Sequence, residues 1–133
     1  MREMPTVLVV DDDPDTLYIL SEVLAAIGCS TVTARNGIEA LEYMARNPLP
    51  DLLMTDLSMP LMDGKGLIES LRRRCAAHGV PMVPVIVVTG AWHERDLAPA
   101  QGTYECIIYK PFDIQTVMKA AASALRLPPK RHS

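Results

Sequence analysis

Apolar residues follow two alternating patterns along the chain. In short stretches they are continuous and rich in β-branched residues, as in Thr6–Val10 and Val83–Val88, which is typical of strands covered on both faces. In longer stretches they recur three or four positions apart, as at Leu17, Leu20 and Leu24, and this is the spacing of one helix face. The chain therefore alternates between predicted strands and predicted helices.

This alternation predicts five strands, each followed by a stretch with helical character. The strands are Thr6–Val10, Ser30–Ala34, Leu52–Met54, Val83–Val88 and Cys106–Tyr109. Repeated strand–helix units predict an α/β fold, in which a parallel sheet carries helices on both faces. The least regular stretch is 91–101, where Trp92 and Leu97 favour at most a two-turn helix because Pro99 prevents a longer one.

The predicted helices have residues that suit their ends. We expect Asp13 to cap the first helix, Gly28 to end it, and Asp113 to cap the last helix. Asp11 and Asp12 have no structural role that the sequence reveals, and adjacent carboxylates repel each other unless a cation lies nearby. The second helix is expected to bury a face made of Ile38, Leu41, Met44 and Ala45.

Polar residues of particular types end four of the predicted strands. They are Asp11-Asp12, Asp56, Thr89 and Lys110. In an open parallel sheet the carboxyl ends of the strands share one edge, and ligands bind there, where the strand order reverses. One aspartate after a strand is commonly a turn residue, but polar residues on four strands of one sheet indicate a functional site.

Composition narrows the possible functions. The chain has 133 residues, which fits one domain, and its net charge of −3 argues against direct nucleic-acid binding. Its three cysteines are odd in number and lack metal-site spacing, so they are expected to be reduced and buried. No apolar stretch has the length of a signal-peptide core or a membrane span. We therefore expect a cytoplasmic protein without membrane association.

The residues at the strand ends favour phosphoryl chemistry. Clustered carboxylates need a counter-ion, and Mg²⁺ suits an oxygen-ligand site of this kind. One carboxylate could then attack an electrophilic phosphoryl group and form an acyl phosphate. Lys110 would supply a compact positive charge for the phosphoryl oxygens, and Thr89 a hydroxyl.

This set of residues, in this order, resembles the receiver domain of bacterial two-component response regulators of the chemotaxis-regulator type. The resemblance extends from Val7 to about Leu125. The segments that carry it are Val9-Val10-Asp11-Asp12, Asp56 with Met59-Pro60 and Asp63-Gly64, Val87-Val88-Thr89-Gly90, and Lys110-Pro111-Phe112.

The resemblance implies a flavodoxin-like doubly wound sheet with strand order 2-1-3-4-5. It implies that Asp56 accepts phosphate from the phosphohistidine of a sensor histidine kinase or a histidine phosphotransfer protein. Asp12, Asp56 and the backbone carbonyl of Ser58 would bind Mg²⁺ directly, and Asp11 largely through water. Thr89 and Lys110 would respond to the phosphorylated state, and the domain would signal to a downstream protein by contact. Such a domain is not an enzyme, although it assists its own phosphorylation and dephosphorylation.

Two features depart from the family pattern. Three residues before the lysine, the family usually has an aromatic residue that moves with the threonine, but here the residue is Ile107. Tyr104 and Tyr109 are nearby but out of register. The stretch 91–101, where a fourth helix is usual, is polar and interrupted by proline. We therefore predict a smaller or different conformational change on phosphorylation.

Three other interpretations remain open. A Mg²⁺-dependent phosphohydrolase with an aspartyl nucleophile usually needs a second acid two residues later, but this chain has Ser58 there. A non-phosphorylated interaction domain of the same fold would have no physical need for adjacent carboxylates. The chain could also be a receiver cut from a larger hybrid kinase or transcription factor. We expect a receiver domain over residues 1–127 and a tail or linker remnant over 128–133.

Overall fold

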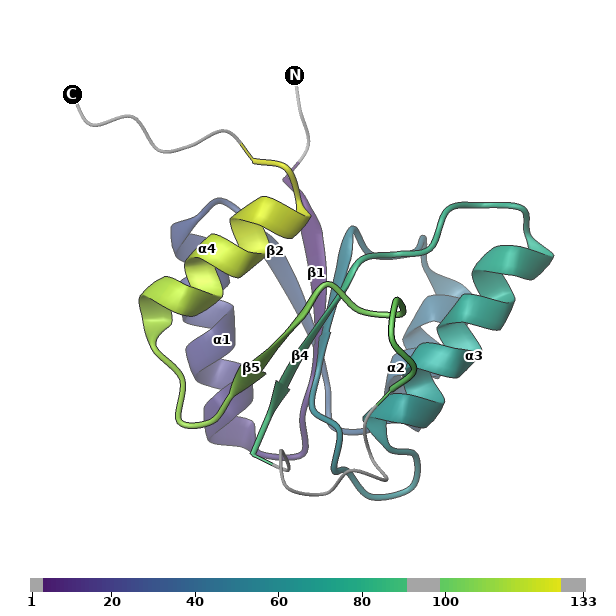
Figure 1. Cartoon of the computed structure of the whole chain (residues 1–133), viewed down its shortest axis with the longest axis horizontal. Coiled ribbons are helices and arrows are strands. Elements are labelled where there is room, and N and C mark those ends of the chain that lie inside the picture. Colours follow the sequence, from purple (N-terminus) through teal and green to yellow (C-terminus); the bar gives the residue numbers. More distant parts are fainter. Residues whose placement is uncertain (1–3, 91–98, 128–133) are drawn as a thin grey trace.

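The computed structural model of the chain describes residues 4–90 and 99–127 (Figure 1). Within these residues, strands and helices alternate as the apolar pattern predicts. The elements are β1 (Thr6–Val10), α1 (Pro14–Ala26), β2 (Ser30–Ala34), α2 (Gly37–Arg46), β3 (Leu52–Thr55), α3 (Gly64–Ala77), β4 (Val85–Thr89), β5 (Cys106–Tyr109) and α4 (Ile114–Ala124).

The five strands form one parallel sheet with the order β2-β1-β3-β4-β5, which confirms the predicted topology. From β1 the chain first moves to β2 at the edge of the sheet and then returns to β3 on the other side of β1. In open parallel sheets such a reversal marks the place where ligands bind, because the loops after the two strands run in opposite directions. The topology therefore favours a site beside Asp11 and Asp56.

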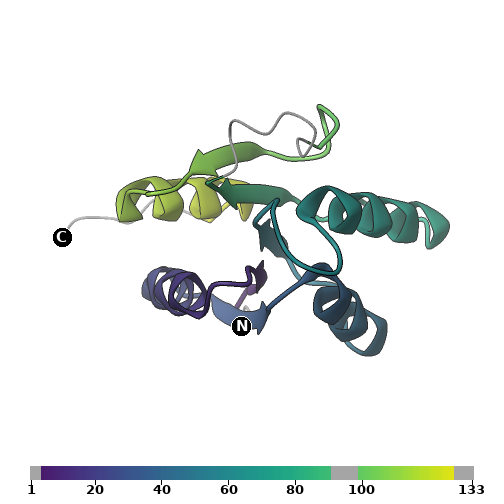
Figure 2. The ribbon, with the colours of Figure 1, turned by 90° about the horizontal axis from the view of Figure 1, so that it is seen from below.

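Helices cover both faces of the sheet, as Figures 1 and 2 show. The helices α1 and α4 pack on one face, where Val7 and Val9 of β1 belong to the core. The helices α2 and α3 pack on the other face, where Leu8 and Val10 belong to a second core. Alternate residues of a strand point to opposite faces, so a strand that is apolar at every position serves both cores.

The predicted helix caps are confirmed. Asp13 accepts a hydrogen bond from the backbone N–H of Asp15, and Asp113 accepts one from that of Gln115. Gly28 follows α1 with a φ of 86°, a conformation that glycine adopts without strain. The predicted strand Val83–Val88 is observed two residues shorter at its start and one residue longer at its end, as Val85–Thr89.

The prediction for the buried face of α2 was partly wrong. Met44 is buried as expected and Leu41 is half-buried, but Ile38 and Ala45 are exposed. Gly37 and Ala40 take the inward positions with Met44. A Cβ on Gly37 would lie 2.7 Å from the Cγ of Met62, so the start of α2 packs closely on the loop after β3. This close packing determines which face of α2 points toward the sheet, and it leaves the Ile38 side chain exposed.

The helices are short. The longest of those described, α3, has 14 residues, and no helix in the described parts is long and apolar enough to cross a membrane. The predicted short helix around Trp92 and Leu97 lies outside the described residues. From 99 to 105 the described chain contains turns and bends but no helix.

The three cysteines are free and largely buried, as predicted. Cys29 and Cys75 are buried in the two cores, and Cys106 is half-buried. Burial raises the pKa of the Cys29 and Cys106 thiols, and the nearby carboxylates of Asp51 and Glu105 respectively add to this effect. These cysteines are therefore packing residues rather than reactive thiols.

Candidate functional site

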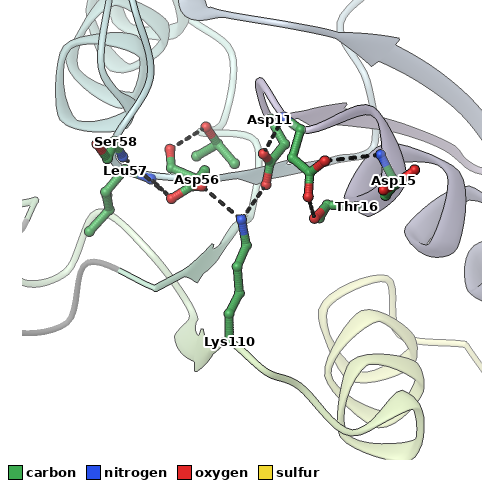
Figure 3. A network of polar contacts seen from close by, with 9 residues as sticks. Asp11, Asp15, Thr16, Asp56, Leu57, Ser58 and Lys110 are labelled. Carbon is green, nitrogen blue, oxygen red and sulfur yellow. Dashed lines mark hydrogen bonds and ion pairs between the residues drawn. The ribbon is translucent and has the colours of Figure 1, made fainter.

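The predicted strand-end residues meet at one edge of the sheet. Asp11 follows β1, Asp56 follows β3, Thr89 is the last residue of β4, and Lys110 follows β5. Figure 3 shows the Lys110 side chain reaching between the two aspartates. Its Nζ lies 2.7 Å from Oδ2 of Asp11 and 2.9 Å from Oδ2 of Asp56. Three residues far apart in the sequence thus form one charged cluster.

Asp11 is buried and fixed by its own loop. Its backbone N–H donates to the carbonyl of Ala34, which extends the pairing of β1 with β2. Its Oδ1 accepts a hydrogen bond from the backbone N–H of Asp13 at 2.9 Å, while Oδ2 faces Lys110. Asp11 therefore does have a structural role, contrary to expectation, because it shapes the turn that leads into α1. The adjacent Asp12 is exposed.

Asp56 is also buried, and both of its carboxylate oxygens have partners. The Oδ1 atom accepts hydrogen bonds from the backbone N–H groups of Leu57 at 2.6 Å and of Ser58 at 3.3 Å. The Oδ2 atom accepts the bond from Lys110. The backbone N–H of Asp56 donates to the carbonyl of Val10 on β1. Backbone donors and one lysine thus support a buried carboxylate that would otherwise be costly to desolvate.

The loop after Asp56 folds back tightly on it. The N–H of Gly64 donates to the carbonyl of Leu57 at 2.9 Å. A Cβ on Gly64 would lie only 2.1 Å from the backbone oxygen of Asp56, so only glycine allows this approach. On β3, the buried hydroxyl of Thr55 donates to the same oxygen at 2.8 Å. No motif in the sequence pointed to Thr55, although it is the one polar residue in the apolar strand Leu52–Thr55.

The charges in the cluster depend on one another. Burial raises the pKa of the Asp11 carboxyl, and the Lys110 hydrogen bond only partly offsets that effect. Burial would lower the pKa of Lys110, but its hydrogen bonds to Asp11 and Asp56 outweigh this, so the pKa rises above its ordinary value of 10.5. Lys110 therefore stays charged at neutral pH and acts as a permanent cation between the buried acids.

Asp11, Asp12 and Asp56 could together hold a metal ion. One carboxylate oxygen from each lies within 4.8 Å of the others. Ligands at the Mg²⁺–oxygen distance of about 2.1 Å can be at most about 4.2 Å apart. Three carboxylates gathered this closely suit an ion that keeps several waters and takes only some of the carboxylates as direct ligands. An all-oxygen set of three acids fits Mg²⁺ and not a thiolate- or imidazole-binding metal.

The remaining predicted site residues lie close by. Thr89 is fully buried, and its backbone carbonyl accepts a hydrogen bond from the N–H of Lys110 at 2.9 Å. Ser58 is exposed, and its backbone N–H faces the Asp56 carboxylate. The role of the Ser58 carbonyl as a metal ligand stays a prediction.

Ile107 pairs with Val87 in the sheet, three residues before Lys110. It is half-buried and packs against the core beneath α2 and α3, as Tyr104 does. Tyr109 is 53% exposed. Neither tyrosine occupies the position of Ile107, so this strand position has an aliphatic side chain.

A pocket of about 620 Å³ lies at the opposite edge of the sheet. It is lined by residues that precede strands and by the end of α4, among them Pro84, Glu105 and Leu125. None of Asp11, Asp56 and Lys110 lines it. The charged cluster is therefore separate from this cavity and lies at the carboxyl edge of the sheet.

Comparison with known proteins identifies a family. Residues 7–122 match the family described as the response regulator receiver domain. Over 122 residues, the chain is 38% identical to the DNA-binding transcriptional regulator NtrC of Escherichia coli strain K12, covering 90% of this chain and 24% of that protein. Over 127 residues it is 32% identical to the sensor histidine kinase GacS of Pseudomonas protegens, covering 92% of this chain and 14% of that protein. The chain thus spans about a quarter or less of the length of these curated relatives.

Solved structures agree with this match. The chemotaxis response regulator CheY4 of Vibrio cholerae superposes with a TM-score of 0.78 at 25% identity, covering 92% of this chain and 99% of that one. A signal receiver domain of an HD domain-containing protein from Pseudomonas fluorescens has a TM-score of 0.81 at 24% identity, covering 95% and 90% of the two chains. The latter likeness shows the fold alone.

Proposed function

Since the chain belongs to the response regulator receiver family of two-component signalling, we propose that Asp56 accepts a phosphoryl group from a phosphohistidine. The observation that carries this proposal is the group of Asp11, Asp12 and Asp56 at the carboxyl edge of the sheet, with Lys110 Nζ bonded to Asp11 and Asp56. A carboxylate at the end of a strand, held by backbone N–H donors and next to a fixed cation, fits the role of a phosphoryl acceptor.

In the proposed reaction an oxygen of the Asp56 carboxylate attacks phosphorus. The phosphorus–nitrogen bond to the donor histidine breaks with its electron pair left on the ring nitrogen, and an aspartyl phosphate forms. The histidine leaves as neutral imidazole when its other ring nitrogen carries a proton. Lys110 Nζ already lies within hydrogen-bond distance of Asp56 Oδ2, so it would neutralise negative charge on the transferring group without a large rearrangement. The N–H groups of Leu57 and Ser58 orient the carboxylate for this attack.

Mg²⁺ would be held by Asp12, Asp56 and the Ser58 carbonyl, with Asp11 acting largely through water. When bound, it would screen the negative charge of the carboxylates and the phosphoryl group. Asp12 is exposed and can be reached from solvent, whereas Asp56 is buried and held in place by the protein. Both suit this arrangement.

After transfer, Thr89 and Lys110 would contact the phosphoryl group and change the surface that partners recognise. Lys110 would move from its two carboxylate partners toward the new charge, and the strand β5 that carries it would respond. Because Ile107 replaces the usual aromatic residue, we expect this response to be smaller than in receivers that have it. The output is a change in protein contacts.

The proposed domain is a signalling module that assists its own phosphorylation and dephosphorylation, rather than an enzyme acting on other substrates. Receiver domains interact with histidine kinases, and we propose a sensor kinase or a histidine phosphotransfer protein as the donor. The receiver would comprise residues 1–127, with 128–133 as a tail or the start of a linker. It would work alone or as part of a longer kinase or transcription factor.

The direct test is incubation with acetyl phosphate and Mg²⁺, followed by intact-mass measurement. We expect wild-type protein to gain one phosphoryl group and Asp56→Asn to gain none. The exposed Asp15→Asn is the matched control and should behave as wild type, while EDTA should prevent the reaction. A folded wild-type protein that binds Mg²⁺ but gains no phosphoryl group would contradict the proposal and favour a non-phosphorylated interaction domain.

A further inference from the structure

Thr55 is a buried polar residue directly before the proposed phosphoacceptor. It is 1% exposed and forms the last position of β3, where it pairs with Val10 and Val87 on the two neighbouring strands. Packing alone would be served equally well by valine, which has the same branched shape and a strong preference for strands. The threonine differs in its hydroxyl, which donates to the backbone oxygen of Asp56 at 2.8 Å.

The Asp56–Leu57 peptide is held from two sides. The Thr55 hydroxyl binds its carbonyl oxygen, and Gly64 lies so close to that oxygen that a Cβ there would be 2.1 Å away. The peptide unit is planar and trans, so its C=O and N–H point in opposite directions. Fixing the oxygen therefore also fixes the N–H of Leu57, which donates to Asp56 Oδ1 at 2.6 Å.

The orientation of this peptide decides how the carboxylate is presented. The Oδ1 atom is occupied by the N–H groups of Leu57 and Ser58, which leaves Oδ2 on the side of Lys110. If the peptide rotated, the Leu57 N–H would leave Oδ1 and the carboxylate could turn about its side-chain bonds. The two oxygens would then no longer hold distinct positions.

We propose that Thr55 is a positioning residue for phosphoryl transfer to Asp56. Its hydroxyl fixes the Asp56–Leu57 peptide, and that peptide holds Oδ1 so that Oδ2 faces Lys110 and the incoming phosphoryl group. This inference rests on the proposed function, because it concerns the same acceptor carboxylate. Thr55 itself does not touch the transferring group.

The test compares Thr55→Val, Thr55→Ser and wild type in the acetyl phosphate reaction with Mg²⁺. Initial rates over a range of acetyl phosphate concentrations separate the maximal rate from the half-saturating concentration. We expect Thr55→Val to lower the maximal rate about tenfold, because poor alignment of reacting groups costs rate, with little change in half-saturation. Thr55→Ser keeps the hydroxyl and should stay within about twofold of wild type.

Thr31→Val is the matched control. The Thr31 hydroxyl lies on β2, and its oxygen is buried without a hydrogen-bond partner, so its loss should leave the rate unchanged. Thermal unfolding of each variant shows whether the protein is folded at the assay temperature. If Thr55→Val does not fold, Thr55→Ala and Thr55→Ser take its place, because both lack the methyl group and only the alanine lacks the hydroxyl.

Equal maximal rates for Thr55→Val and wild type would overturn the inference, as would an equal loss in Thr31→Val. So would a Thr55→Ser protein as slow as the valine variant. These results differ from a failure of the proposed function, in which wild-type protein itself gains no phosphoryl group. A phosphorylated wild type with an inactive Asp56→Asn and an unimpaired Thr55→Val contradicts the positioning role alone.

Discussion

The proposed acceptor side and the proposed read-out side of the site are held in place in different ways. The acceptor side comprises residues 11–13 and 55–64, on the loops after β1 and β3. The read-out side comprises Thr89 and residues 104–112, around the end of β4 and the whole of β5. Hydrogen bonds within each loop fix the acceptor groups. The N–H of Asp13 donates to Oδ1 of Asp11, and the N–H of Leu57 donates to Oδ1 of Asp56.

The read-out side reaches the site mainly through one long side chain. Lys110 bonds to carboxylates that lie 99 and 54 residues away in the sequence. Its strand β5 is at the edge of the sheet and is only partly buried, whereas β3 is buried throughout. The acceptor loops are held by hydrogen bonds within themselves, whereas the read-out side is joined to them by one side chain that follows an edge strand. The site thus combines an acceptor side that is fixed locally with a read-out side that depends on one long side chain.

The largest effect is expected from Gly64→Ala, which would break the acceptor side. The added Cβ would lie 2.1 Å from the Asp56 backbone oxygen, and this oxygen belongs to a fixed loop that cannot easily yield. We expect the free energy of unfolding to fall by about 3 kcal/mol, measured by urea denaturation.

Gly66→Ala is the matched control in the same helix. The nearest atoms to a Cβ there are side-chain atoms of Asp63 and Met62 at 3.2 and 3.3 Å, which can shift. We expect a change within about 1 kcal/mol, since alanine also favours the helix. Similar losses in both variants would show that the acceptor loop is not the locally fixed element that we infer.

Lys110→Met would test whether one cation links the two sides. Removing it leaves Asp11 and Asp56 buried without a positive partner, and breaking a buried ion pair is costly. The Lys110 side chain is 24% exposed, so we expect a smaller loss, about 2 kcal/mol, in protein without Mg²⁺. The exposed Lys119→Met should change the free energy of unfolding by less than about 0.5 kcal/mol.

Mg²⁺ should stabilise Lys110→Met more than wild type, because it would supply the missing charge. Unfolding curves with Mg²⁺ and with EDTA measure this difference. An equal response of the two proteins to Mg²⁺ would mean that Lys110 and the metal act on separate groups.

Alkaline pH should weaken the same link in wild-type protein. The pKa of Lys110 is raised above 10.5 in the folded state, so its stabilising contribution is fully present below about pH 10.5 and is lost as pH rises through the folded-state value. The stability difference between wild type and Lys110→Met should therefore shrink above pH 10.5, by at most about 2 kcal/mol. The free energy of unfolding of both proteins would be measured by urea denaturation from pH 9 to 12. The difference between the two proteins cancels the titration of other groups, which both share.

The smallest effect is expected on the read-out side from Ile107→Tyr. Phosphorylated and unphosphorylated protein would be compared by amide chemical shifts over residues 104–112. We expect the shift changes to be larger in Ile107→Tyr than in wild type, because the aromatic ring can follow Thr89, and Ile107→Leu should resemble wild type. Shift changes in wild type as large as in the tyrosine variant would contradict a reduced response.

Much of the site could be predicted because its residues stand at strand ends. The apolar run of β1 stops at Asp11 and that of β3 stops just before Asp56, and parallel strands bring such ends together. The functional roles of Asp56, Thr89 and Ser58 stay predictions until the phosphorylation test. The features that the sequence did not predict share one cause, because they depend on how the loops pack. The buried face of α2 is set by Gly37 against Met62, and no periodicity in the helix itself records that contact.

The sequence by itself determined the strand–helix order, the helix caps and the residue types at the carboxyl edge, because these depend on short-range patterns of polarity and turn chemistry. Tertiary structure decided which atoms face each other. The bond of Lys110 to two distant aspartates, the structural role of Asp11 and the approach of Gly64 to Asp56 all arise when separate loops are brought to one edge. Such contacts join groups that come from separate loops, so local patterns of polarity do not encode them.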